Sequence, residues 1–78
     1  MKVYNSTRWR KLRESHLRAH PLCEMCEREG RVTPGEDVHH IQTFTQARDD
    51  RERDRLAYDP ANVMTLCKSC HRQMHHGH

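Results

Sequence analysis

The sequence predicts a single small α+β domain, spanning residues 1–78, whose hydrophobic core is too small to hold it together unaided. The chain has 78 residues, of which 33% are hydrophobic and 32% are charged. So short a chain buries little apolar surface, and a crosslink, a metal or a partner has to offset the entropy lost on folding. Two Cys-x-x-Cys pairs, at 23/26 and 67/70, offer that crosslink. The expected order is helix, cysteine knuckle, strand, polar loop, strand and helix.

The N-terminal segment predicts an amphipathic helix. Either Asn5 or Ser6 can cap it, and Trp9, Leu12 and Leu17 fall on one side at helical spacing. The proline at position 21 should end it. We expect Trp9 to anchor the core; stacking on a nucleobase is the alternative role for this side chain.

The centre of the chain predicts short strands and a long polar connection. Turn residues at 30, 34 and 35 bracket short segments that can be strands, and Asp37 to Ile41 is expected to form one. The charge-mixed stretch from Gln42 to Asp59 fits a short helix or an ordered loop. Residues 59–62 resemble a turn, Val63 to Leu66 a strand, and Lys68 to about His76 a final helix.

Positive charge is concentrated at the N-terminal end. Residues 1–20 carry six Lys or Arg and a single acid, whereas the remainder carries eight basic and ten acidic side chains. Such a field favours a polyanionic partner, although a solvated helix face would give the same pattern. The candidate phosphate contacts are Arg8, Arg10, Lys11, Arg13, Arg51 and Arg53.

The spacing of the four cysteines predicts a structural zinc site. A two-residue gap lets both thiolates of a knuckle point at one ion about 2.3 Å from each sulfur, and two knuckles complete a closed tetrahedron. No apolar run reaches membrane-spanning length and no secretory signal precedes the domain, so we expect a cytoplasmic protein with reduced thiols and no membrane partner. Disulfides or a redox Cys-x-x-Cys are the competing interpretations.

Eight histidines are an excess for this length, and their grouping is informative. His71 and His75 are four residues apart, so on a helix they share a face and can approach one cation. His39 and His40 close the first predicted strand, where neighbours point to opposite faces and one can ligate while the other stays free. The remaining C-terminal histidines, at 76 and 78, are expected to have no role.

Taken in order, these motifs resemble those of the HNH endonucleases, in particular the small HNH proteins of phages and prophages. The resemblance is carried by Cys23-x-x-Cys26, Val38-His39-His40-Ile41, Pro60-x-Asn62 and Leu66-Cys67-x-x-Cys70-His71, with Trp9-Arg10-x-Leu12-Arg13 and Pro21-Leu22-Cys23 preceding them. It implies a ββα-metal core over residues 23–76, in which two antiparallel strands and a helix clamp one divalent cation. Residues 1–22 would form a basic helical segment beside it.

The resemblance also implies roles for individual residues. His40 would be the general base, His71 a metal ligand, and Asn62 an orienting or loop-fixing residue, with direct ligation as its competing role. Many family members have aspartate where this chain has His39. The nuclease colicins are similar in pairing two histidines on the strand with two on the helix, which would make His39, His71 and His75 the ligands. Asp37, on the same strand face as His39, is a fallback ligand.

The implied activity is hydrolysis of DNA phosphodiester bonds by a monomer or weak dimer. One active site per chain should nick duplex DNA, with weak sequence preference, and leave 5′-phosphate and 3′-hydroxyl ends. An imidazole-rich site suits Mn²⁺, Ni²⁺, Co²⁺ or Zn²⁺ as well as Mg²⁺. Proteins of a phage packaging machine are candidate partners. The alternative is a zinc-stabilised nucleic-acid-binding module without catalysis.

Overall fold

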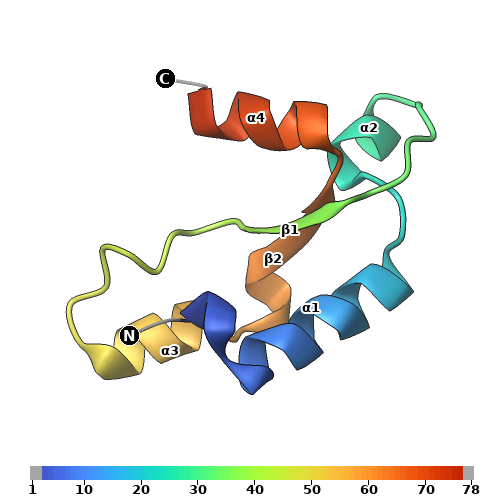
Figure 1. The fold of residues 1–78 in the computed structure, drawn as a ribbon. Helices are drawn as coiled ribbons and strands as arrows, with labels where there is room; N and C mark the ends of the chain where they lie inside the picture. Colours follow the sequence, from blue (N-terminus) through green and yellow to red (C-terminus); the bar gives the residue numbers. More distant parts are fainter. Residues whose placement is uncertain (1–2, 77–78) are drawn as a thin grey trace.

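Two short antiparallel strands lie at the centre of the fold, and the helices are arranged around them (Figure 1). The computed structural model describes residues 3–76, and the side chains of residues 3–74. Strand β1 spans Asp37–His40 and β2 spans Val63–Leu66. Asp37 pairs with Leu66 at one end and His40 with Val63 at the other. Both strands lie where the sequence predicts them, and β1 ends one residue earlier.

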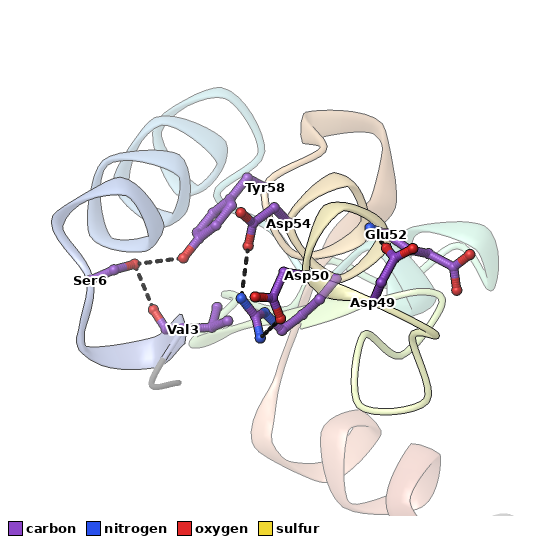
Figure 2. Close-up of polar contacts among 8 residues, drawn as sticks. Val3, Ser6, Asp49, Asp50, Glu52, Asp54 and Tyr58 are labelled. Carbon is purple, nitrogen blue, oxygen red and sulfur yellow. Dashed lines mark hydrogen bonds and ion pairs between the residues drawn. The ribbon is translucent and has the colours of Figure 1, made fainter.

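Helix α1 spans Thr7–Ala19 and is capped by Ser6, which is one of the two predicted cap residues. The Ser6 hydroxyl accepts a hydrogen bond from the Trp9 amide at 3.1 Å and donates to the Val3 carbonyl at 2.7 Å, within the short 3₁₀ turn Val3–Asn5. Tyr58, just beyond α3, donates its hydroxyl to Ser6 at 3.1 Å. Figure 2 shows the contacts of Ser6 with Val3 and Tyr58, the second of which joins the start of α1 to the end of α3.

The polar connection contains a helix rather than only a loop. Helix α3, Asp50–Ala57, is capped by Asp49, whose carboxylate accepts from the Glu52 amide at 2.8 Å (Figure 2). The 3₁₀ turn Pro60–Asn62 then leads into β2, and α4, Lys68–His76, ends the described chain where the sequence predicts it.

The segment between the first cysteine and β1 differs from the prediction. Helix α2, Glu24–Arg28, follows Cys23 directly, and residues 31–36 form no strand but a single bridge between Leu22 and Pro34. Gly35 explains the close packing here, since a Cβ atom at this position would collide with the Thr65 side chain. The Glu24 carboxylate accepts from His16 at 2.9 Å and from the Thr65 amide at 2.6 Å, joining α1, α2 and β2.

The buried side chains form two clusters. The thiol core is the cluster of the four cysteines with Met64 and Leu66, flanked by Met25. The aromatic core comprises Val3, Trp9, Val38, Ala57 and Val63, flanked by Leu12, Leu17, Phe44 and Tyr58. The prediction that Trp9 anchors a core is confirmed, since only 5% of this residue is exposed. None of the described helices is long and apolar enough to cross a membrane.

Candidate functional site

The four cysteines converge on one point in the thiol core. Cys23 and Cys26 come from the start of α2, and Cys67 and Cys70 from the junction of β2 with α4. All four are buried free thiols whose sulfurs lie within 4.8 Å of one another. The Cys26 and Cys70 sulfurs are 3.8 Å apart, a separation that suits a tetrahedron with metal–sulfur bonds of about 2.3 Å. These residues fit a closed four-thiolate metal centre.

Two further residues act on this centre that the spacing of the cysteines does not reveal. Arg31 points its guanidinium at the Cys26 sulfur at 3.6 Å. Hydrogen bonds from Thr33 and Arg31 lower the pKa of Cys26, whereas burial among the other thiols raises the pKa of Cys70. Without a cation the site therefore favours the thiolate of Cys26 and disfavours that of Cys70, and a bound dication would offset the charge of all four thiolates.

The side chains of β1 alternate between the two sides of the strand pair. Figure 1 shows α4 and α1 on opposite sides of the two strands. His39 faces α4, where its ring centroid lies 5.3 Å from that of His71. His40 faces α1, where its ring stacks on Trp9 with centroids 4.7 Å apart. Although His39 and His40 face different helices, both of them line one groove together with His71.

Asp37 contacts His71 rather than standing apart from it. The carboxylate accepts a hydrogen bond from Nδ1 of His71 at 2.9 Å, and Nζ of Lys68 lies 3.4 Å from its other oxygen. Burial alone would raise the pKa of Asp37, but the bond from His71 and the charge of Lys68 outweigh it and hold that pKa below its ordinary value. The bond assigns the proton of neutral His71 to Nδ1, so Nε2 is its cation-binding nitrogen.

His40 is buried, with 7% of its surface exposed, and its ring is fixed in position. Nε2 lies 2.9 Å from the Ala57 carbonyl, which can only accept, so this nitrogen carries the proton and Nδ1 carries the lone pair. Within the described part of the chain, Nδ1 is buried and has no hydrogen-bond partner. A neutral, oriented imidazole with an unused lone pair can accept a proton.

Asn62 holds the backbone around His40. Its side-chain amide donates to the carbonyls of Gln42 and Leu56, at 3.0 and 2.9 Å, and its oxygen accepts from the Gln42 amide at 2.9 Å. These bonds tie the chain after β1 to the last turn of α3, which carries the Ala57 carbonyl. The arrangement suits a loop-fixing residue better than a metal ligand.

Comparison with known proteins decides the family. Residues 23–77 match the HNH endonuclease family. The chain belongs to this family. It is a nuclease domain whose four cysteines lie close enough to hold a metal ion, and the resemblance and fold class predicted from its motifs are confirmed.

One solved structure shares the fold of this HNH domain. It is the crystal structure of the HNH endonuclease of the deep-sea thermophilic bacteriophage GVE2 with manganese ion. The match has a TM-score of 0.74 and 29% sequence identity, and it covers 95% of this chain and 75% of that one. No curated protein sequence gives a significant match.

The cations proposed for DNA binding are unequally available in this HNH domain. Arg10 and Lys11 are exposed on α1, and Arg8 lies over the Tyr58 ring at 4.2 Å. Arg13, also on α1, donates to the Glu36 carbonyl. Arg51 is exposed on α3. By contrast, Arg53 pairs with Asp50 at 3.0 Å and lies 3.5 Å from Asp54, so the neighbouring acids already neutralise it.

The third ligand suggested by the colicin resemblance, His75, has a side chain outside the described residues. The side chains of His76 and His78 also lie outside the described residues.

Proposed function

We propose that this protein is a metal-dependent DNA endonuclease in which His40 is the general base. The observation that carries the proposal is the hydrogen bond between Nε2 of His40 and the Ala57 carbonyl. It leaves Nδ1 as the basic nitrogen of a residue that lines one groove together with His39 and His71. Nδ1 would take a proton from water as that water attacks the phosphorus atom, and the products would be 5′-phosphate and 3′-hydroxyl ends.

A divalent cation would be held by His39 and His71, with His75 as the proposed third ligand. Asp37 fixes the His71 imidazole through its bond to Nδ1, so we assign it an orienting role in place of the fallback ligand role. When bound, the cation supplies Lewis-acid stabilisation of the phosphate and of the leaving oxygen. Imidazole ligands suit Mn²⁺, Ni²⁺, Co²⁺ or Zn²⁺, and the phosphate oxygens also permit Mg²⁺.

A structural zinc on Cys23, Cys26, Cys67 and Cys70 completes the proposal. Support comes from the four convergent sulfurs, since zinc accepts a closed tetrahedron of thiolates. Cys70 directly precedes His71, so this ion would also set the position of the helix that carries the catalytic ligand. Residues 1–78 would then act as one domain.

The exposed cations of α1 would bind DNA phosphates. Arg10 and Lys11 lead this set, with Arg8 and Arg13 beside them, and Arg51 contributes from α3. Phosphate contacts fix position without reading bases, so we expect weak sequence preference. A monomer with one active site would cut one strand at a time.

A plasmid-nicking assay tests the proposal. Zinc-loaded protein is incubated with supercoiled plasmid and Mn²⁺ or Mg²⁺, and we expect nicking that falls by about 10²–10⁴-fold in His40→Ala, as for loss of a general base. His20→Ala is the matched control, since His20 is an exposed histidine at the end of α1. Melting of each variant checks that the fold survives. Equal nicking by wild type and His40→Ala would overturn the proposal.

The competing function is a zinc-stabilised nucleic-acid-binding module. The thiol core and the cations of α1 favour it, because neither requires the groove. A gel shift of the same DNA without any His40-dependent nicking would establish that function instead.

A further inference from the structure

Exposed apolar side chains gather beside the catalytic histidines. Among the described side chains, four large apolar residues are exposed, and three of them line the groove of His39, His40 and His71. These three are Tyr4, Ile41 and Met74, with 62%, 54% and 38% of their surfaces exposed. The fourth, Val32, is not part of the groove lining. Leaving apolar surface in water next to an active site favours an apolar ligand there.

Apart from its histidines, the groove is lined by described side chains that carry no formal charge. Its volume is about 680 Å³, and no Lys, Arg, Asp or Glu is found among its described lining residues. The other lining side chains include Phe44, Thr43 and Thr45 from the connection after β1. The cations suited to phosphates lie on α1 instead. The wall of the groove therefore suits the uncharged parts of a nucleotide, which are the base and the sugar.

Tyr4 has the geometry of a stacking platform. Its ring meets buried Trp9 edge-on, with centroids 5.4 Å apart, and Phe44 at 5.6 Å. Phe44 in turn lies 4.9 Å from the His40 ring. The Tyr4 ring is thus held on one side by the aromatic core while most of its surface is open. A fixed aromatic ring of this kind stabilises a base that has left its own stack.

We infer that this groove binds unpaired nucleobases next to the scissile phosphate, so that the enzyme prefers single-stranded or locally unpaired DNA to intact duplex. The inference rests on the proposed nuclease function. In an intact duplex the base faces are covered by their neighbours, and only a base taken out of the stack can lie against Tyr4. Nicking of a supercoiled plasmid would then occur where negative supercoiling opens the duplex.

Cleavage of three matched oligonucleotides tests the inference. One sequence is presented as a single strand, as a perfect duplex and as a duplex with a central mismatch, with zinc-loaded protein and Mn²⁺. We expect the single strand and the mismatched duplex to be cut about tenfold faster than the perfect duplex, as stacking of one base predicts. Equal rates on all three substrates would overturn the inference.

Paired variants identify the groove as the source of the preference. We expect Tyr4→Ser and Ile41→Ser to lower the rate on unpaired DNA towards the rate on duplex, whereas Tyr4→Phe keeps the preference. Val32→Ser is the matched control for Ile41→Ser, since it removes an exposed β-branched side chain outside the groove. A uniform fall on all three substrates would mean a merely structural role and would overturn the inference.

A binding assay separates this inference from the proposed function. Single-stranded DNA containing 2-aminopurine is titrated with zinc-loaded protein without added Mn²⁺. Stacking on Tyr4 should quench the fluorescence of the probe in the wild type, and the quenching should be weaker with Tyr4→Ser. Absence of His40-dependent cleavage on every substrate would refute the nuclease function alone, because quenching is still measurable. Unchanged quenching in Tyr4→Ser would refute the base-binding groove.

Discussion

The thiol core and the aromatic core share one strand but are stabilised by different means. Leu66, at one end of β2, belongs to the thiol core, and Val63, at the other end, belongs to the aromatic core. Four of the six buried members of the first are cysteines, which crowd polarisable sulfurs together and need a cation to compensate their charge as thiolates. The second consists of ordinary apolar packing around Trp9.

The difference matters because the proposed active site depends on both cores. His40 is positioned by the aromatic core, through its stacking on Trp9. His71 follows the last cysteine of the thiol core, so its position depends on that centre. One core therefore orients the proposed base, and the other orients a proposed ligand of the catalytic cation.

Removing the metal proposed to bind in the thiol core should have the largest effect. Chelation, or Cys67→Ser, should unfold the domain, because metal binding to such sites supplies about 10–16 kcal/mol of folding free energy, more than a small core provides. Circular dichroism with metal analysis measures this, and added Zn²⁺ should restore the signal after chelation. An unchanged spectrum in a sample verified to be metal-free would refute the structural role of the thiol core.

Weakening the aromatic core should be costly but should leave the metal bound. Trp9→Ala should lower the free energy of unfolding by about 3–5 kcal/mol through lost packing and a cavity. Urea denaturation of the zinc-loaded protein measures the change, with exposed Val32→Ala as control. Loss of zinc from folded Trp9→Ala would show that the two cores are not separable.

Asp37→Asn should act on the catalytic cation with little effect on folding. Loss of the charged acceptor for His71 Nδ1 should weaken Mn²⁺ binding by about 10–100-fold, as for other residues that orient a ligand. Isothermal titration of the zinc-loaded protein measures this affinity. Glu36→Gln is the matched control, because Glu36 is the exposed neighbouring carboxylate. Equal Mn²⁺ affinity in wild type and Asp37→Asn would exclude the orienting role.

The smallest effect is expected at the start of α1. Ser6→Ala removes the cap of the helix and the acceptor for Tyr58, and should cost about 1 kcal/mol of stability. Thermal unfolding of the zinc-loaded protein measures it. Ser15→Ala, at an exposed position within α1, should be neutral or slightly stabilising. A similar loss in both variants would point to a general effect on the helix rather than to the cap.

Local signals account for what the sequence predicted well. The cap of α1, the bounds of β2 and α4, and the convergence of the cysteines all follow from residue types at short spacing. Helix α2 was not predicted, because its five residues overlap the first Cys-x-x-Cys pair, which was interpreted as a knuckle alone. Residues 31–36 were misjudged because contacts with distant segments, such as that of Gly35 with Thr65, decide their path.

The finer features of the site depend on contacts that no sequence pattern contains. The tautomer of His40 is set by a backbone carbonyl, that of Ala57, which carries no side-chain signal. The bond from His71 to Asp37 exists only because α4 packs on β1. Tyr4 and Phe44 reach the groove from separate segments, so their proximity to His40 required the fold.

The alternation of side chains along β1 limits which insertions and deletions the gene can tolerate. Asp37 and His39 face α4, whereas Val38 and His40 face α1. Inserting or deleting one codon within this strand would exchange the two histidines between the proposed base and ligand positions, since strand side chains have a period of two. Inserting two codons instead of one would return both histidines to their original sides of the strand. Among natural relatives, length changes should therefore collect in the connection between β1 and α3 and be absent from the four residues of the strand.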